Sequence, residues 1–246
     1  MTRKILVTGS SGAIGKAIVK LFRSGGDFVI GLDKSLSEDV IPDHFIKADL
    51  NDLVLSEDCL ANIIGNITSA VGPQGLDVLV NNAAYQYVDR THPIPVGEIT
   101  RSHNINFIAP YLLITSLAEI LAVDVGSVVN IGSVHSRLTK TGFFAYAATK
   151  AALASLTRSL AIDYGDKIRI NCIEPASVAT PMLLEGFAQN PGARETLESY
   201  HPQGRISTPQ EVAGLVKMIC DPALGSLHGA CIDLSGAVAS KLHDPA

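Results

Sequence analysis

Short apolar runs alternate with helix-length segments along nearly the whole chain, and this alternation limits the folds that the chain can adopt. Each run is five or six residues long and rich in valine, isoleucine and leucine, which is typical of a strand buried on both faces. Seven runs have this character: Lys4–Thr8, Phe28–Leu32, His44–Ala48, Leu76–Val80, Ser127–Ile131, Ile168–Ile173 and Ala230–Leu234. Four intervening segments are predicted as helices: Ala13–Arg23, about Ile99 to Ala122, Ala147–Tyr164 and Pro209–Cys220.

Strands separated by helices form parallel βαβ units. The sequence therefore predicts an α/β fold with a doubly wound, seven-stranded parallel sheet and helices on both faces. We expect residues 1–246 to form a single domain, because parallel α/β domains often reach this length. The stretch Met182–Gln203 breaks the alternation and contains Pro191, Gly192 and Pro202. We predict an irregular substrate loop at about 182–203, since long insertions of this kind often form lids.

Composition excludes several classes of function. Charged residues make up only 17% of the chain, which fits a sheet covered on both faces. The formal net charge is −5 and no basic cluster occurs, so we predict no nucleic-acid partner. The apolar stretch Phe107–Val125 is interrupted by polar residues and is predicted as a buried helix, not a membrane span. Met1–Thr8 lacks a signal-peptide layout. The four cysteines form no CxxC pair and no zinc-like cluster, so we predict no metal and a cytoplasmic location.

A glycine-rich turn joins the first strand to the first helix. Residues 8–15 read T-G-S-S-G-A-I-G. Glycines let the backbone approach a pyrophosphate closely, and the helix amino terminus offers free N–H groups to that anion. A tight strand-to-helix turn also needs glycine for purely structural reasons, so the loop alone is weak evidence.

An acid at the end of the second strand strengthens the interpretation. Asp33 follows Gly15 by 18 residues, where a carboxylate can accept hydrogen bonds from the ribose hydroxyls of an adenine nucleotide. It would also repel the additional phosphate of NADP, although the adjacent Lys34 could soften this discrimination. We therefore predict NAD in preference to NADP; the alternative is an exposed turn aspartate.

Tyr146 and Lys150 form a Tyr-x-x-x-Lys motif in a predicted helix, where positions i and i+4 lie on one face. An ammonium beside a phenol favours the phenolate and lowers its pKa, which makes tyrosine a usable acid and base. The spacing alone is common in amphipathic helices. However, Ser133 ends a strand 13 residues earlier, and Asn106 lies in the long helix after the fourth strand.

The T-G-x-x-x-G-x-G turn, the sequence Asn81-Asn82-Ala83-Ala84, the serine and the Tyr-x-x-x-Lys motif together resemble the short-chain dehydrogenase/reductase family. The resemblance covers nearly the whole chain and implies a single-domain Rossmann fold, oxidoreductase activity and a nicotinamide cofactor. It also implies a homo-oligomer, a dimer or a homotetramer, built through the two longest predicted helices.

The resemblance implies four catalytic residues. Tyr146 exchanges a proton with the substrate oxygen, and Ser133 hydrogen-bonds that oxygen. Lys150 lowers the pKa of the tyrosine and holds the nicotinamide ribose, while Asn106 helps to hold a water linked to Lys150. The predicted cofactor-binding residues are Gly9, Ser11, Gly12, Ala13, Ile14, Gly15, Asp33, Asp49, Leu50, Asn82, Ala83, Ala84, Tyr146, Lys150, Pro175, Val178 and Thr180.

Three departures from the family pattern concern glycine. Ala84 and Ala176 each replace a usual glycine, which is tolerable where the backbone avoids positive φ. Ser235-Gly236-Ala237 stands where many members have Asp-Gly-Gly, a departure that touches the terminal segment.

The substrate is a small molecule, and its predicted contacts are Gln86, Ser133, His135, Phe143, Tyr146 and Met182. Tyr87, Phe144 and Phe187 are also expected to face the pocket. Gln86 and His135 resemble the 3-hydroxybutyrate dehydrogenase branch, which has a lysine where this chain has Phe143; Lys140 is nearby but displaced. The sequence Ser-Val-His also occurs in sugar-oxidising members.

We therefore predict an NAD-dependent oxidoreductase that interconverts a small polar secondary alcohol (a hydroxy acid, sugar or polyol) and its ketone. An NADPH-dependent carbonyl reductase is the alternative within enzymes. A non-catalytic NAD-binding regulator is the alternative from another class.

Overall fold

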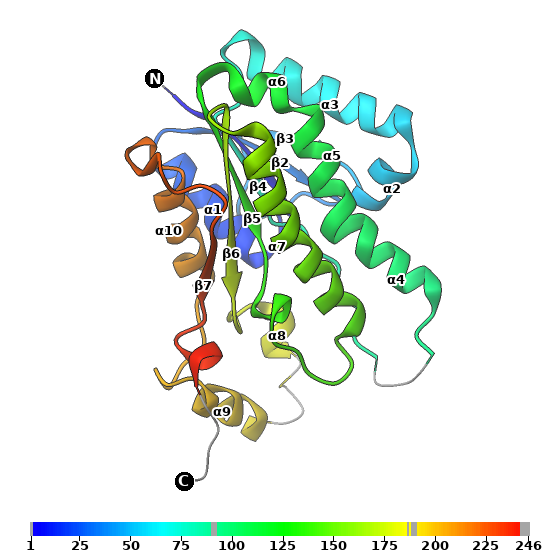
Figure 1. The fold of residues 1–246 in the computed structure, drawn as a ribbon, viewed down its shortest axis with the longest axis vertical. Helices are drawn as coiled ribbons and strands as arrows, with labels where there is room; N and C mark the ends of the chain where they lie inside the picture. The colour runs from blue at the N-terminus through cyan, green and yellow to red at the C-terminus, as the bar shows by residue number, and fades with distance from the viewer. Residues whose placement is uncertain (1, 90–92, 186, 188–190, 242–246) are drawn as a thin grey trace.

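The computed structural model describes residues 2–89, 93–185, 187 and 191–241, and its centre is one parallel sheet (Figure 1). Seven strands pair in the order β3-β2-β1-β4-β5-β6-β7, with every pairing parallel. The strands are β1 (Lys4–Thr8), β2 (Phe28–Asp33), β3 (His44–Lys47), β4 (Val78–Asn81), β5 (Gly126–Ile131), β6 (Ile168–Pro175) and β7 (Cys231–Leu234). The predicted doubly wound, seven-stranded α/β fold is confirmed.

Helices cover both faces of the sheet, and alternate strand residues pack against each layer (Figure 1). Helices α1 (Ala13–Ser24) and α10 (Pro209–Ile219) pack on one face, where they bury Phe22 and Val216. Helices α3 (Glu57–Val71), α5 (Ala109–Ser116) and α7 (Phe144–Tyr164) pack on the other. The remaining helices are α2 (Leu50–Leu55), α4 (Val96–His103), α6 (Ala118–Leu121), α8 (Pro181–Glu185) and α9 (Pro191–Tyr200).

The long helix predicted from Ile99 to Ala122 is neither straight nor continuous. It begins with α4, passes through a π-helical turn, η2 (Asn104–Ile108), and continues as α5. After Ser116 the chain bends by 64° into α6. Among the described residues, no single helix is long and apolar enough to cross a membrane. The bent pair Val96–Ser116 and Ala118–Asp124 reaches the required length and apolar composition only when its two parts are taken together.

The segment predicted as an irregular loop at 182–203 is mostly helical, so that prediction is wrong. Helices α8 and α9 occupy it, and each begins at a proline, a residue favoured in the first turn of a helix. Both lie at the carboxyl ends of the strands (Figure 1). Of the residues that suggested irregular structure, Pro191 and Gly192 instead lie in the first turn of α9, and Pro202 follows its end.

Two non-glycine residues of the described chain have positive φ, namely Val125 and Ala237. Ala84 and Ala176 do not, which explains why alanine is tolerated at both positions. Ala237 has a φ of 66°, so the departure from Asp-Gly-Gly places a side chain in a left-handed conformation. Val125, with a φ of 49°, ends the helical turn η3 (Ala122–Asp124) just before β5.

Replacing Val125 by glycine should stabilise the protein. A β-branched residue is strained at positive φ, and the Val125 side chain is 52% exposed, so little packing is lost. We expect Val125→Gly to raise the free energy of unfolding by about 1 kcal/mol, measured by urea denaturation. Val125→Ala keeps the left-handed residue and serves as the control. A Val125→Gly protein less stable than Val125→Ala would contradict the strain.

Candidate active site

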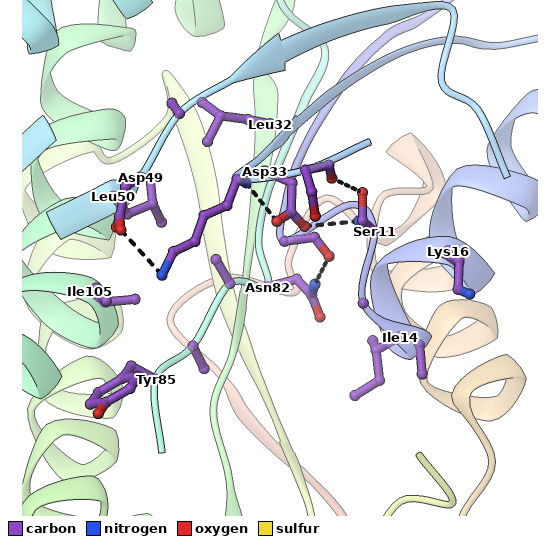
Figure 2. Close-up of a pocket in the computed structure, with 18 of the residues that line it drawn as sticks. Ser11, Ile14, Lys16, Leu32, Asp33, Asp49, Leu50, Asn82, Tyr85 and Ile105 are labelled. Atoms are coloured by element: carbon purple, nitrogen blue, oxygen red, sulfur yellow. Dashed lines mark hydrogen bonds and ion pairs between the residues drawn. The ribbon is translucent and has the colours of Figure 1, made fainter. Parts of the chain in front are cut away.

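A cavity of about 590 Å³ opens at the carboxyl ends of β1, β2 and β4, beside the start of α1 (Figure 2). Of the residues predicted to bind cofactor, it is lined by Gly9, Ser11, Gly12, Ala13, Ile14, Asp33, Asp49, Leu50, Asn82, Ala83, Ala84 and Thr180. Sequence reasoning missed other lining residues, among them Ala48, Tyr85 and Ile105. Ala48 follows β3, Tyr85 lies in the segment after β4 and Ile105 lies in the π turn. No sequence motif marks any of them.

The amino terminus of α1 faces this cavity without a side-chain cap. Gly12 is the N-cap residue, no side chain accepts a hydrogen bond from the first turn, and that turn contains no acid. Free backbone N–H groups and the positive end of the helix dipole are therefore available to an anion. Gly15 does not line the cavity: a Cβ there would lie 2.0 Å from the Gly9 carbonyl oxygen, so glycine is required for the turn to close.

The Asp33 carboxylate is held at the end of β2 by two backbone N–H groups. Oδ2 accepts from Ser11 at 2.9 Å and Oδ1 accepts from Lys34 at 2.7 Å (Figure 2). Each carboxylate oxygen can accept a further hydrogen bond. The Ser11 hydroxyl donates to the carbonyl of Ser35, which fixes the glycine-rich loop against the turn after β2. The acid is thus oriented before any ligand reaches it.

The two lysines that line this cavity, Lys16 and Lys34, are paired with other acids. The Lys34 ammonium lies 3.2 Å from Asp49 (Figure 2), and the Lys16 ammonium lies 3.0 Å from Asp39. Burial acts to raise the pKa of Asp49, but hydrogen bonds from the Asn51 backbone and from Lys34 outweigh it and lower that pKa. Lys34 is therefore directed away from Asp33, toward the opposite wall of the cavity.

A second cavity, of about 460 Å³, adjoins the first and shares Ile14, Asn82, Ala84 and Thr180 with it. Among the described side chains, it contains those that the sequence assigned to catalysis and to the substrate pocket, except Asn106, Tyr87, Phe144 and Phe187. Its predicted members are Gln86, Ser133, His135, Phe143, Tyr146, Lys150, Pro175 and Val178. Two further walls come from α9 and the segment after it, through Leu197, Tyr200 and His201.

Ser133, Tyr146 and Lys150 come together from β5 and α7. Ser133 follows β5 and accepts a hydrogen bond from the His135 backbone at 3.2 Å, which starts a short 3₁₀ turn. The Lys150 ammonium donates to the Ile131 carbonyl at 2.7 Å and lies 5.5 Å from the centre of the Tyr146 ring. The Lys150 side chain is only 2% exposed.

The direction of the tyrosine pKa differs from the sequence-based expectation. Burial raises the pKa of Tyr146 to about 12, and a hydrogen bond with Ser133 opposes this rise. Burial also lowers the pKa of Lys150 to about 8. The expectation that Lys150 lowers the tyrosine pKa neglected desolvation, which penalises both charged forms in this cavity.

Asn106 is buried in the π turn and lines neither cavity. Its amide nitrogen donates to the Tyr85 carbonyl at 2.8 Å and to the Thr149 hydroxyl at 3.0 Å. Its amide oxygen accepts from the Tyr85 backbone at 2.7 Å. The side chain thus joins the segment after β4 to α7, next to Lys150, and both of its donor hydrogens are used within the protein.

A chain of buried amides and hydroxyls fixes α7 against the sheet. Asn81 donates to Asn130 at 2.8 Å, Asn130 donates to Thr157 at 3.0 Å, and Thr157 donates to the Leu153 carbonyl. These residues join β4, β5 and α7. These hydrogen bonds fix the position of α7 along β5, and hence the distance between Tyr146 and Ser133.

Aromatic rings form one wall of the second cavity. His135 stacks on Phe143 with ring centres 4.7 Å apart and meets Tyr146 edge-on at 5.7 Å. The Lys140 ammonium lies 4.4 Å above Phe143, so a cation stands at this wall despite its displaced position in the sequence. Burial, reinforced by the charge of Lys140, lowers the pKa of His135.

Four predicted substrate contacts require separate comment. Phe144 is 59% exposed on the outside of α7, so its predicted place in the pocket is wrong. Tyr87 and Phe187 do not line the cavity either; the Tyr87 hydroxyl donates to Asp89. Met182 belongs to α8, but its side chain lies outside the part of the chain that the structure describes.

Comparison with known proteins agrees with this geometry. A family model described as enoyl-(acyl carrier protein) reductase matches residues 9–236. The chain belongs to the short-chain dehydrogenase/reductase family. The L-fucose dehydrogenase of Rattus norvegicus is 30% identical over 237 residues, which cover 89% of this chain and 83% of that protein. The NAD-dependent glycerol dehydrogenase of Listeria innocua is 25% identical over 243 residues, covering 96% and 93%.

A solved structure supports the same assignment. The ligand-free aldohexose dehydrogenase of Thermoplasma acidophilum matches with a TM-score of 0.91 at 26% identity, covering 100% of this chain and 97% of that one. The short-chain dehydrogenase/reductase described here is therefore an oxidoreductase with a Rossmann fold, and nicotinamide dinucleotides are the cofactors of its class.

Removing the Lys150 ammonium should stabilise the fold. Its pKa is lowered from 10.5 to about 8, so the folded protein binds this proton less tightly than the unfolded chain does. The resulting cost is complete below pH 8 and disappears as the pH rises through 10.5. It amounts to about 3 kcal/mol, of which the lost hydrogen bond to Ile131 offsets about 1 kcal/mol.

We therefore expect Lys150→Met to raise the free energy of unfolding by about 2 kcal/mol at pH 7, with the gain shrinking toward pH 10. Urea denaturation at both pH values measures this difference. The exposed lysine of α1 provides a control, Lys20→Met, which should show no such pH dependence. A Lys150→Met protein less stable than the wild type at pH 7 would show that the buried ammonium is not costly.

Proposed function

We propose that this protein is an NAD-dependent dehydrogenase that interconverts a small polar secondary alcohol and its ketone. The observation that carries the proposal is the meeting of Ser133, Tyr146 and Lys150 in a cavity that adjoins the cavity of about 590 Å³ at the start of α1. A nicotinamide dinucleotide supplies hydride transfer when it is bound, and the protein supplies orientation and proton transfer.

The residues present fit such a cofactor. The uncapped start of α1 is suited to a pyrophosphate, and Asp33 is suited to a ribose diol at the far end of the same cavity. Val178 and Thr180 lie on the opposite side, where the second cavity begins. We propose the cofactor-binding residues predicted from the sequence as its contacts, with Gly15 acting through the shape of the loop.

Each catalytic side chain has a proposed role. Tyr146 transfers a proton to or from the substrate oxygen, and Ser133 donates a hydrogen bond to the same oxygen. Because burial raises the pKa of Tyr146, its phenol is protonated at neutral pH and ready to act as an acid toward a ketone. Lys150 places a cation beside the ring, where it would stabilise the phenolate that remains after proton transfer. Asn106 positions α7 through Thr149.

The charges around Asp33 favour NAD over NADP. A phosphate on the adenosine ribose would approach the Asp33 carboxylate, and the two ammonium groups of the cavity wall, those of Lys34 and Lys16, are already paired with Asp49 and Asp39. This arrangement makes the alternative, an NADPH-dependent carbonyl reductase, the weaker proposal. The glycerol dehydrogenase relative is named as NAD-dependent.

The second cavity indicates a small, polar substrate. Its volume of about 460 Å³ is at the small end of ligand pockets, and its walls carry Gln86, His135 and Lys140 beside apolar groups. The relatives named above act on a sugar, a polyol and an aldohexose. We propose a sugar or polyol, with a hydroxy acid as the alternative that Lys140 would favour.

Quaternary structure and location follow as lesser proposals. Tyr111 on α5 is 43% exposed and Ile162 on α7 is 82% exposed, on the two helices through which the sequence predicts association. We propose a homotetramer or dimer in the cytoplasm. A non-catalytic NAD-binding regulator would not need Ser133, Tyr146 and Lys150 to converge on one cavity.

Turnover should depend on the Tyr146 phenol. We expect the wild type to form NADH from NAD with at least one sugar, polyol or 3-hydroxy acid of a panel, and Tyr146→Phe to lose at least about 10²-fold in rate. Oxidation should accelerate toward high pH, because the raised pKa keeps the phenol protonated at pH 7. Absorbance at the NADH band measures both. Tight NADH binding without turnover on any substrate would favour the regulator instead.

Asp33 should set the cofactor preference. Asp33→Asn keeps the shape of the side chain but removes its charge, so the repulsion of a 2′-phosphate is lost. We expect the ratio of NADP to NAD dissociation constants to fall by about tenfold, which corresponds to about 1.4 kcal/mol. Fluorescence titration with NADH and NADPH measures the ratio. Lys34→Ala is the control and should leave it nearly unchanged; a ratio unaffected by Asp33→Asn would refute the assignment.

A further inference from the structure

Two cysteines far apart in the sequence face each other on neighbouring strands. Cys172 on β6 and Cys231 on β7 are register partners, and Glu174 lies two residues along β6 on the same face. The two sulfur atoms and a Glu174 carboxylate oxygen all lie within 4.8 Å of one another. No spacing in the sequence suggests this pairing, because it arises from the parallel β6–β7 register.

The two cysteines lie on the same face of the sheet as the catalytic residues, one to two turns further along α7. Tyr146, Lys150, Ala154 and Arg158 follow one another at four-residue spacing on α7. The Cys231 sulfur lies 3.8 Å from the Ala154 carbonyl oxygen and 3.5 Å from an Arg158 nitrogen. The stripe of α7 that begins with the catalytic tyrosine therefore ends on the thiol pair.

Cys172 also touches the segment that carries the catalytic serine. A Cβ placed on Gly132 would lie only 2.6 Å from the Cys172 sulfur, so the sulfur packs directly on this glycine. The neighbours of Gly132 are Ile131, whose carbonyl receives the Lys150 ammonium, and Ser133. A change in the position of the Cys172 sulfur would therefore reach two catalytic residues through one glycine.

The two thiols differ in the way that a reactive and a resolving cysteine differ. Cys231 is partly exposed, and its pKa is lowered by a hydrogen bond with Cys172 and by Arg158. Cys172 is completely buried, and its pKa is raised by the same hydrogen bond and by burial. A cysteine with a lowered pKa that solvent can reach, next to a second cysteine, is the usual arrangement at sites of reversible oxidation.

The third member of the cluster favours oxidation over metal binding. The two Glu174 oxygens accept hydrogen bonds from Ser136 at 2.5 Å and from Arg137 at 3.1 Å. Arg137 also pairs with Asp233, the register partner of Glu174. A cation would have to compete with this guanidinium for the carboxylate, and the nearby positive charge opposes its binding.

We propose that Cys172 and Cys231 form a peroxide-sensitive thiol pair that closes to a disulfide behind the active site. The Cys231 thiolate attacks hydrogen peroxide, its sulfur gains one oxygen as a sulfenic acid, and the leaving hydroxide takes up a proton as water. The Cys172 thiol then attacks the Cys231 sulfur, the sulfur–sulfur bond forms and a second water leaves. Overall, the two thiols lose two electrons and two protons, and one peroxide is reduced to two waters.

Thiol counting and peptide mapping test the crosslink without any substrate. We expect stoichiometric hydrogen peroxide to lower the number of titratable thiols in the full-length protein from four to two. It should also yield one peptide pair joined through Cys172 and Cys231. Dithiothreitol should restore all four. Cys231→Ser should keep its three thiols and form no crosslink. Cys59→Ser removes a partly exposed cysteine on α3, far along the chain, and should still crosslink.

Sulfinic acid on Cys231 without a crosslink, or a stoichiometric metal ion bound by the purified protein and lost in Cys231→Ser, would overturn the proposal. The link to the active site rests on the proposed function and has its own readout. NADH binding, measured by fluorescence, should weaken several-fold on oxidation, recover with dithiothreitol and be unaffected by peroxide in Cys231→Ser. A crosslinked protein with unchanged NADH affinity would reject this link and leave the proposed dehydrogenase activity standing.

Discussion

The position of α7 against the sheet is the constraint on which the candidate site depends, and buried polar groups set it. Apolar packing between α7 and β5 could accommodate a small sliding of the helix, because leucine and alanine contacts have little direction. The chain from Asn81 through Asn130 to Thr157 could not, since each broken bond would leave a buried donor at a cost of about 1–3 kcal/mol. The fold thus holds two catalytic side chains at a fixed height over the serine.

The same helix face meets three different requirements. Near its start it presents Tyr146 and Lys150 to a cavity, in the middle Thr157 receives the Asn130 amide, and Arg158 reaches the edge strand β7. Small residues such as Ala154 fill the positions between, which lets the helix lie close to the strands. A compact α7 is therefore as important to the site as the motif that it carries.

The fold and most of the walls of the site could be predicted from the sequence because they rest on local patterns. The strand runs repeat with a clear period, and the glycine-rich turn and the Tyr-x-x-x-Lys motif each lie within eight residues. Contributions that depend on tertiary proximity could not be predicted in this way. His201 reaches the cavity only because α9 folds over it, and Cys172 meets Cys231 only through the strand register. The raised pKa of Tyr146 likewise depends on burial, which no motif encodes.

The π turn at Asn104–Ile108 has a consequence for how the protein could change over generations. A π turn contains one more residue than an α-helical turn, so it separates the angular phase of α4 from that of α5. Loss of one residue there would restore a regular helix but rotate everything before it by roughly 100° about the axis. The Glu98 carboxylate, which now accepts a hydrogen bond from the Tyr85 hydroxyl, would then turn away from it. The length of this helix at the π turn is therefore more tightly constrained than the exposed side chains along it.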